Sequence, residues 1–257
     1  VAVSTRNMRA IQRAIQKGVS VIPCTGRVLD MLPPQLITQE GLRYFVTCHG
    51  ARVVDSEKNE TLYEDMIPPE EAAQLMALLE GRGLYNEIAA NATIYLEKTI
   101  ADTLDRQPVP EHHLWYMRDR CYTALEKPSE FMRKNGVGVE KMNIYGVPAE
   151  LQQEIYDAVT ATGFIKHTRL GAGPNLEFSH RTLDKIKATD TLLEKLGISY
   201  AETMAIGDSS SDLEIIRRCG VGVAMGNAPE NIKREADDVT VVNTEDGVAL
   251  AFEKYVL

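Results

Sequence analysis

Two aspartates lie four residues apart at the end of a short apolar run, a spacing that could hold a metal ion. Asp208 follows the run Met204–Gly207, and Asp212 comes after three serines where the next helix is predicted to start. Two carboxylates held so close repel each other, and burying them is costly unless a positive group lies between them. Mg²⁺ takes few protein carboxylates and fills its other positions with water and substrate phosphate. The pair predicts a magnesium site, although Asp212 alone is explained equally well as an acid at a helix N-terminus.

A second group of candidates could bind a phosphoryl group. Thr25, Gly26 and Arg27 follow the apolar run Val19–Cys24 and offer a hydroxyl and free backbone N–H groups. By itself this tripeptide is weak evidence, because most such matches are plain polar turns. In an open parallel sheet, however, ligands bind beyond the carboxyl ends of the strands. The convergence of these residues with the aspartates is therefore what indicates a site.

Two further positions belong with this group. His49 and Gly50 also follow a predicted strand, and so would lie at the same edge of the sheet. Lys185 precedes a helix in the second half of the chain. Considered alone it is best interpreted as a solvated surface lysine, and Lys187 competes for any role given to it.

Composition limits the classes of function. The chain has 257 residues, enough for one large domain or two modest ones, and its 44% apolar and 25% charged residues are ordinary for a globular protein. With 28 basic and 37 acidic residues the formal charge is −9. Nucleic-acid affinity comes mostly from basic groups neutralising phosphates, so we expect no nucleic-acid partner. A small anionic ligand could still bind in a local positive pocket.

The cysteines and the hydropathy pattern predict a cytoplasmic protein with no membrane partner. Cys24, Cys48, Cys121 and Cys219 show neither CxxC nor zinc-site spacing. Cys24 and Cys48 end apolar runs, so both are expected to be small buried hydrophobes in a reducing compartment. No stretch has the charge and hydropathy of a signal peptide or the length of a membrane span.

The pattern of helices and strands predicts an α/β fold in two domains. Strands alternate with helices from residue 183 onward, which indicates a doubly wound parallel sheet in a Rossmann-like core. The middle of the chain differs, because its helices and strands do not alternate regularly, which is typical of an α+β unit. We therefore expect a core made of residues 1–63 and 180–257, with a smaller α+β cap domain of residues 64–179 inserted into it.

Several of these stretches resemble one family. The segment Ala205–Tyr255 resembles the C-terminal third of the Cof-type haloacid dehalogenase-like (HAD) phosphatases, and its part "GVAMGNAPENIK" is quite specific. "VSVIPCTGR" followed by "VTCHGARVVD" resembles the second motif of that family and the strand after it. "NLEFSHRTLDKIKATDTLLEKLGI" resembles the stretch that ends the cap and carries the motif lysine, which falls on Lys185. The resemblance covers nearly the whole chain in the expected order.

The resemblance implies Mg²⁺-dependent hydrolysis of a small phosphorylated metabolite, with sugar phosphates as the default substrates. It implies that Thr25 hydrogen-bonds the phosphoryl group and that Lys185 neutralises the charge that develops on it. Asp208 would then bind the metal, and Asp212 would support the metal or orient the lysine. Gly26, Arg27, His49, Gly50 and Asn227 would be phosphate-side or substrate-side contacts. Cap loops near Asn86–Asn91 and His112–Tyr116 would set specificity.

The chain also departs from the family pattern. The family usually has asparagine at the positions of Ser211 and His49, and glycine at the position of Ile186. Its first motif is a strand ending in Asp-x-Asp, in which the first aspartate attacks phosphorus and the second acts as general acid and base. The 257 residues contain no Asp-x-Asp, and the sequence starts at the helix that follows this motif in the family.

Three interpretations follow from the sequence. In the first, the chain is a phosphatase whose nucleophile lies on an N-terminal strand outside the sequence given. In the second, it is a catalytically inactive HAD-like protein that binds a metabolite and a metal. The third, an unrelated doubly wound binding domain, does not explain the ordered motifs. Phosphate release that depends on Mg²⁺ distinguishes the first two. The substrate and the oligomeric state cannot be deduced from the sequence.

Overall fold

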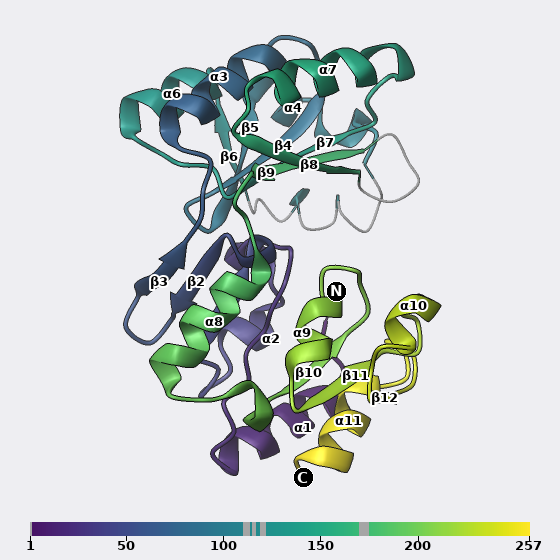
Figure 1. Ribbon diagram of the computed structural model, residues 1–257. Coiled ribbons are helices and arrows are strands. Elements are labelled where there is room, and N and C mark those ends of the chain that lie inside the picture. The colour runs from purple at the N-terminus through teal and green to yellow at the C-terminus, as the bar shows by residue number, and fades with distance from the viewer. Residues whose placement is uncertain (1, 110–113, 115–116, 119–121, 170–174) are drawn as a thin grey trace. The chain divides into compact units, whose positions relative to one another are not determined.

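The structure is a computed structural model that describes residues 2–109, 114, 117–118, 122–169 and 175–257. The chain folds into two compact units, which we describe separately (Figure 1). Unit 1 comprises Val1–Cys24, Leu32–Tyr63 and Asp184–Leu257. Unit 2 comprises Thr25–Met31 and Glu64–Leu183.

Unit 1 is an α/β unit with two three-stranded sheets, of order β1-β2-β3 and β10-β11-β12, among the residues described. Its strands are β1 (Tyr44–Thr47), β2 (Arg52–Asp55), β3 (Glu60–Glu64), β10 (Met204–Gly207), β11 (Val221–Ala224) and β12 (Asp238–Val239). Its helices are α1 (Thr5–Gln16), α2 (Pro34–Ile37), α8 (Lys185–Leu196), α9 (Leu213–Arg218), α10 (Glu230–Lys233) and α11 (Gly247–Tyr255). This architecture, together with the solved structures described below, confirms the α/β, Rossmann-like fold class.

The C-terminal half of unit 1 contains the predicted parallel sheet. β10 pairs with β11 in parallel, from Met204 opposite Val221 to Gly207 opposite Ala224, and β11 pairs with β12 in parallel. α9 connects β10 to β11 as a crossover helix. It lies so close to β11 that a Cβ at Gly222 would come within 2.2 Å of a carbonyl oxygen of that helix. The β-α-β order predicted from the sequence therefore brings the end of β10 and the start of α9 together.

The apolar run Val19–Cys24 was predicted as a strand, and that prediction is wrong for most of its length. Only Cys24 makes a β-bridge, to Val46 of β1, and the residues before it have no strand assignment. β10 pairs only with β11 among the residues described, so its other edge is free. Val21 and Ile206 nevertheless pack against one apolar cluster, centred on α1 and α11. The apolar run and β10 thus share a cluster, and one edge of β10 lacks a strand partner in the described part of the chain.

The N-terminal half of unit 1 contains a tight antiparallel hairpin. Thr47 at the end of β1 faces Arg52 at the start of β2, and the one-turn 3-10 helix η2 (Cys48–Gly50) connects them. Cys48, His49 and Gly50 all have positive φ, at 48°, 57° and 96°. This left-handed geometry turns the chain sharply where the predicted His49–Gly50 pair lies.

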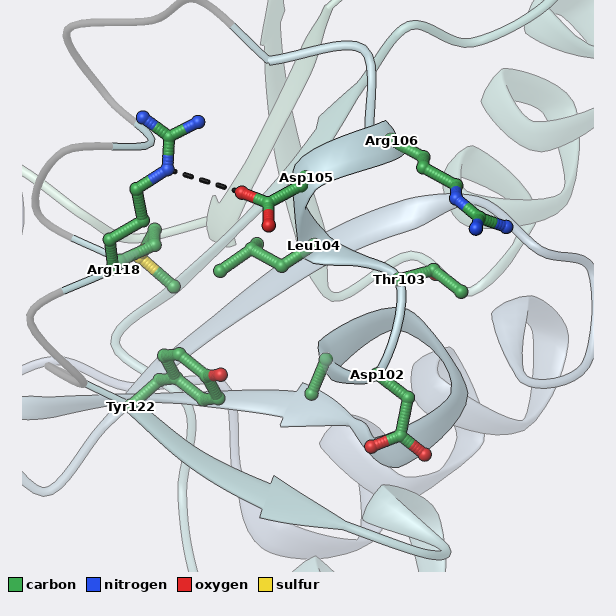
Figure 2. Close-up of a pocket in the computed structure, with 9 residues that line it drawn as sticks. Asp102, Thr103, Leu104, Asp105, Arg106, Arg118 and Tyr122 are labelled. Atoms are coloured by element: carbon green, nitrogen blue, oxygen red, sulfur yellow. Dashed lines mark hydrogen bonds and ion pairs between the residues drawn. The ribbon is translucent and has the colours of Figure 1, made fainter.

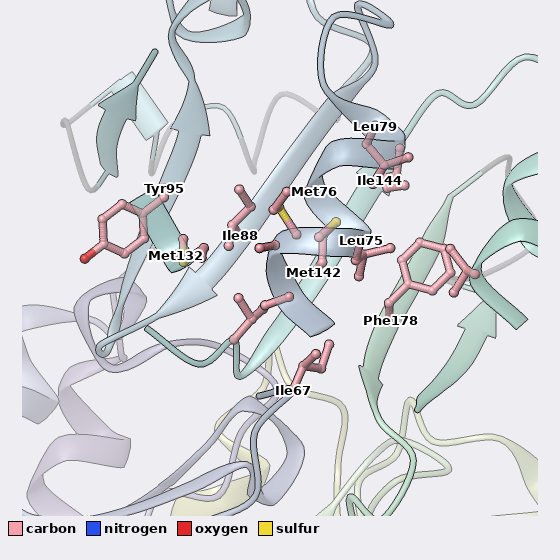
Figure 3. Close-up of a cluster of buried hydrophobic side chains, with 14 of the residues drawn as sticks. Ile67, Leu75, Met76, Leu79, Ile88, Tyr95, Met132, Met142, Ile144 and Phe178 are labelled. Carbon is pink, nitrogen blue, oxygen red and sulfur yellow. The ribbon is translucent and has the colours of Figure 1, made fainter. Parts of the chain in front are cut away.

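Unit 2 is a six-stranded sheet of order β6-β5-β4-β7-β9-β8, with helices on one face (Figure 1). The strands are β4 (Tyr85–Ala90), β5 (Thr93–Glu97), β6 (Tyr122–Leu125), β7 (Lys141–Tyr145), β8 (Ile165–Arg169) and β9 (Leu176–His180). The helices are α3 (Pro69–Leu79), α4 (Lys98–Ala101), α6 (Pro128–Asn135) and α7 (Ala149–Ala161). Met76 from α3, Ile88 from β4 and Met142 from β7 lie in the buried core between sheet and helices (Figure 3).

Unit 2 contains residues 64–179, for which an α+β domain was predicted, together with a segment that was expected to belong to the core. Thr25–Met31 groups with unit 2, where Val28 is fully buried and Met31 is 5% exposed. The segment Asn86–Asn91, expected as a cap loop, is mostly strand β4 instead, and both faces of that strand are buried. The second expected loop, His112–Tyr116, lies outside the described residues except for Leu114.

Two smaller expectations concern the cysteines and membranes. Cys48 is buried as expected, whereas Cys24 is exposed because its segment has no strand neighbour on the side of β10. Cys121 lies outside the described residues. Within the described part of the chain, no helix combines the length and the apolar character needed to cross a bilayer.

Candidate active site

The carboxyl end of β10 holds a buried ion pair between two of the predicted site residues. Lys185 Nζ lies 2.6 Å from Asp212 Oδ1, and the two side chains are 8% and 20% exposed. Lys185 is the first residue of α8, whose N-cap Asp184 accepts a hydrogen bond from the Ile186 N–H. The start of α8 thus directs a cation toward the end of a parallel strand.

Asp212 is held in place from the other side by the serine that follows Asp208. Its Oδ2 accepts hydrogen bonds from Ser209 N at 3.1 Å and Ser209 Oγ at 2.8 Å. A Cβ at Gly207 would come within 2.5 Å of the Asp212 Cβ, so only glycine leaves room for this packing. Asp212 precedes α9 but makes no capping hydrogen bond. Its side chain instead binds Lys185 and the Ser209 turn that precedes the helix.

The electrostatics of the pair favour the ionised forms of both groups. Burial by itself raises the pKa of Asp212, but the Lys185 ammonium and the Ser209 hydrogen bonds outweigh it and hold that pKa below its ordinary value. Burial lowers the pKa of Lys185, whereas the neighbouring Cys24 and Asp212 raise it, and the net shift is upward. The site therefore contains a desolvated ammonium group whose pKa lies above its ordinary value.

Asp208 is the exposed carboxylate of the site. Its Oδ2 accepts a hydrogen bond from Asn227 Nδ2 at 2.8 Å, and Asn227 Oδ1 in turn accepts from the Asn243 N–H at 2.9 Å. Asn227, predicted as a substrate-side contact, thus orients the carboxylate. Asp208 Oδ1 is a hard oxygen of the kind that Mg²⁺ binds.

The carboxylate oxygens at the end of β10 supply part of the coordination that a magnesium ion needs. Within the described residues, no group of three or more carboxylate, histidine or cysteine side chains could hold a metal ion. Mg²⁺ needs only one or two carboxylates besides waters and substrate phosphate, and Asp208 supplies one of them. Asp212 uses both carboxylate oxygens for Lys185 and Ser209, so it fits better as the group that orients the lysine.

The hairpin turn of η2 packs directly on the start of α8. A Cβ at Gly50 would lie 2.8 Å from the Lys185 Cα and 3.2 Å from the Ala188 Cβ. Gly50 also has a φ of 96°, which side-chain-bearing residues rarely adopt. The predicted Gly50 therefore lies against the backbone of the predicted lysine, and His49 precedes it with a partly buried side chain.

Thr25, Gly26 and Arg27 belong to unit 2, whereas the other predicted site residues belong to unit 1. Thr25 Oγ1 accepts a hydrogen bond from the Arg27 N–H at 3.2 Å, so the hydroxyl closes a short turn around Gly26. All three residues are partly exposed. The structure therefore brings Lys185, Asp208, Asp212, Asn227 and Gly50 together in unit 1, and forms the Thr25 turn in unit 2.

Two residues of the site were missed by the sequence interpretation. Ser209 contributes two hydrogen bonds to Asp212, and the run of three serines between the aspartates was the available signal. Cys24 lies beside the Lys185 ammonium, and each of the two groups shifts the pKa of the other. Its position at the end of an apolar run suggested only a packing role.

Unit 2 also contains a hollow that is distinct from these residues. It has a volume of about 430 Å³ and is lined by Ala101–Arg106, Met117, Arg118 and Tyr122. Arg118 and Asp105 form an ion pair of 3.1 Å in it (Figure 2). No residue predicted from the sequence lines this hollow.

Comparison with known proteins shows the family of the chain. A family model of haloacid dehalogenase-like hydrolases matches residues 1–252. The chain belongs to the haloacid dehalogenase-like hydrolases. This HAD-like hydrolase is 27% identical to the phosphatase YwpJ of Bacillus subtilis over 266 residues, covering 96% of this chain and 91% of that protein.

Other relatives agree with this assignment. The HAD-like hydrolase is 28% identical over 258 residues to a Bacillus subtilis protein named 5-amino-6-(5-phospho-D-ribitylamino)uracil phosphatase, covering 99% of this chain and 89% of that one. A crystal structure of a haloacid dehalogenase-like hydrolase from Bacteroides thetaiotaomicron matches with a TM-score of 0.77 and 27% identity, covering 98% of this chain and 92% of that one. The fold and the family are thereby established.

Proposed function

We propose that this HAD-like hydrolase is a magnesium-dependent phosphatase of a small phosphorylated metabolite. The observation that carries the proposal is the buried Lys185–Asp212 pair at the carboxyl end of β10, next to the exposed carboxylate of Asp208. Phosphoryl transfer requires little from a protein beyond positioning and stabilisation of negative charge. A fixed ammonium group beside a metal-binding carboxylate supplies both.

Lys185 neutralises the charge that develops on the phosphoryl oxygens in this proposal. Its desolvation strengthens that interaction, since a low-dielectric setting weakens screening by water. Asp212 keeps the ammonium charged and in one orientation, so its role is that of a positioning residue. Ser209 fixes Asp212 by two hydrogen bonds.

Mg²⁺, when bound, neutralises phosphoryl oxygens and orients the phosphate for in-line attack. Asp208 would hold it, with Asn227 orienting that carboxylate through a hydrogen bond of 2.8 Å. Asp212 supports the metal only through its charge, because its oxygens are occupied by Lys185 and Ser209. The acidic charge of the site is then balanced in part by the lysine.

On the substrate side, we assign Thr25 to the phosphoryl group as a hydrogen-bond donor. Gly26 and Arg27 extend this contact through backbone N–H groups and a guanidinium. His49 and Gly50 border the lysine at the start of α8. Residues 64–179 would form the cap domain, whose loops would set substrate specificity.

The nucleophile in this proposal is an aspartate on a strand outside the 257 residues. The sequence contains no Asp-x-Asp, and the free edge of β10 is bordered by apolar residues. A strand added at this edge would end beside Asp208 and Lys185. Its carboxylate would attack phosphorus, and the ester oxygen would leave with a proton from the second aspartate of the same motif. Water would then hydrolyse the aspartyl-phosphate to release phosphate, giving its proton back to that aspartate.

A sugar phosphate or a similar metabolite is the substrate class we propose. One relative is named for a phosphorylated ribitylamino compound, and a solved HAD subclass IIB sugar phosphatase shares the fold at a TM-score of 0.73 and 22% identity. Both names describe a phosphate on a polyhydroxylated carbon chain. A panel of sugar phosphates, polyol phosphates and phosphorylated cofactors therefore covers the proposal.

The test uses protein expressed from its native gene, with phosphate release measured on this panel with and without Mg²⁺. We expect release that depends on Mg²⁺ and a phosphorylated aspartate after acid quenching, detected by mass spectrometry. Binding of a phosphorylated compound without any release would contradict hydrolysis and support the inactive binding protein. An intact mass measured on the same sample shows which segments the assayed protein contains.

A further inference from the structure

The turn of the β4–β5 hairpin in unit 2 has an alanine at a position where glycine is usually found. Asn91 and Ala92 connect the strands with φ values of 52° and 65°. Two left-handed residues in a two-residue hairpin form the turn that usually carries Asn-Gly. Alanine at the second position is strained by roughly 1 kcal/mol relative to glycine, so something else must hold this turn.

A fully buried carboxylate holds it. Glu140 is 0% exposed, and its Oε1 accepts a hydrogen bond from the Ala92 N–H at 3.0 Å. Its own N–H donates to the Ala89 carbonyl at 2.8 Å, which fixes Glu140 at the end of the β4–β7 pairing. Burying a carboxylate is costly unless it accepts hydrogen bonds, so this contact has a structural purpose.

The other side of the turn contacts the Thr25–Met31 segment. The Asp30 N–H donates to the Ala92 carbonyl at 3.1 Å. The neighbouring Val28 and Met31 are buried, at 0% and 5% exposure, so the segment is also anchored by apolar packing. A continuous series of contacts thus runs from Glu140 through Ala92 to the segment that begins with Thr25 and Arg27.

We infer that Glu140 is a positioning residue, which acts through the Asn91–Ala92 turn to fix the Thr25–Asp30 loop. The inference rests on the proposed function in one respect, the assignment of Thr25 to the phosphoryl group. Since that loop packs on the β4–β5 hairpin, its geometry is set by unit 2. Phosphate binding and the conformation of the hairpin are then coupled.

The direct test is hydrogen exchange of the loop in Glu140→Ala. Loss of the Ala92 contact should make the Asp30 amide exchange about tenfold faster, as expected for losing one hydrogen bond of ordinary strength. Glu140→Gln keeps an oxygen acceptor and should restore most of the protection. Glu97→Ala is the matched control, because Glu97 is also buried in this sheet but binds Gly81 N and Thr99 Oγ1.

A double-mutant cycle keeps the test independent of global destabilisation. Ala92→Gly relieves the left-handed strain, so Glu140→Ala should accelerate exchange of residues 25–31 less in that background than alone. Equal acceleration in both backgrounds would overturn the inference. So would an unchanged loop in Glu140→Ala, or a change of the same size in Glu97→Ala.

Activity then tests the consequence for the site. If Thr25 binds the phosphoryl group, Glu140→Ala should lower kcat/KM about tenfold or more and Glu140→Gln should recover it. A normal kcat/KM with a loosened loop would overturn the positioning role. An unsubstituted protein without phosphatase activity would overturn the proposed function alone, because exchange of the loop decides the coupling by itself.

Discussion

Lys185 Nζ lies 2.6 Å from Asp212 Oδ1, and residues 27 positions apart in the sequence thereby form the central ion pair of the site. Two elements make the pair possible. Gly50 lets the β1–β2 turn approach the Lys185 backbone, and Gly207 lets the Asp212 side chain fold back on β10. The geometry of the pair is therefore set by glycines that carry no chemistry themselves.

Removing the counter-charge should cost both activity and stability. Asp212→Asn leaves the buried ammonium without its partner, so desolvation would lower the pKa of Lys185. We expect kcat to fall by about 100-fold or more, and the free energy of unfolding to fall by about 3 kcal/mol. Kinetics and denaturant unfolding measure both. The control is Asp190→Asn on α8, which removes a carboxylate charge but keeps an oxygen acceptor for the Tyr200 hydroxyl, and it should leave kcat nearly unchanged.

The pH dependence of the pair follows from the directions of the two pKa shifts. The pKa of Asp212 lies below 3.8, so its contribution to stability is complete above that pH and is lost as the pH falls through the lowered pKa. The pKa of Lys185 lies above 10.5, so its contribution is complete below that pH and is lost as the pH rises through the raised pKa. In Asp212→Asn the lowered pKa of Lys185 lets the folded protein lose that proton toward alkaline pH, so the difference in unfolding free energy from wild type should narrow there. The difference should stay constant from about pH 5 to pH 7. A difference that changes steadily across this range would contradict the assignment.

Gly50→Ala should disturb the lysine as well as the turn. The new Cβ would lie 2.8 Å from the Lys185 Cα, at a φ of 96°. Gly18→Ala is the matched control, because Gly18 has a φ of 83° with nothing within 4 Å. Both variants should lose about 1–2 kcal/mol to backbone strain. Only Gly50→Ala should also lower kcat, by displacing the start of α8, and equal kinetics of the two variants would argue against this contact.

Asn227→Ala should weaken metal binding without removing a metal ligand. The substitution leaves Asp208 Oδ2 without its donor at 2.8 Å, and losing such an orienting partner typically costs 10–100-fold in metal affinity. Calorimetric titration with Mg²⁺ in the presence of inorganic phosphate measures the effect. Asp237→Asn is the control, since Asp237 accepts from the Gly222 N–H at the opposite end of β11. Equal Mg²⁺ affinities in the two variants would contradict the role of Asn227.

Most of the fold and part of the site could be predicted from the sequence. Alternation of strands and helices after residue 183 indicated the parallel sheet, because period and length distinguish those elements. The position of Asp208 at a strand end followed from the same pattern. The pairing of Asp212 with Lys185 did not, since a lysine at the start of a helix is most often solvated and only tertiary packing buries it.

The Val19–Cys24 prediction shows a second limit. An apolar run indicates a strand only if a neighbour completes its hydrogen bonds, and that neighbour is not visible in local composition. Glu140 was missed for a related reason. Nothing in its local sequence shows that it will be fully buried against the turn at Ala92, because that contact joins residues 48 positions apart.

The central claim is that the Lys185–Asp212–Asp208 site hydrolyses phosphate monoesters with the help of Mg²⁺. The most direct measurement is phosphate release from the substrate panel by protein expressed from its native gene, alongside Lys185→Ala, each with and without Mg²⁺. We predict release by the wild type only with Mg²⁺, and a rate at least about 100-fold lower in Lys185→Ala. Equal rates in the two proteins, or no release by the wild type from any compound, would contradict the claim.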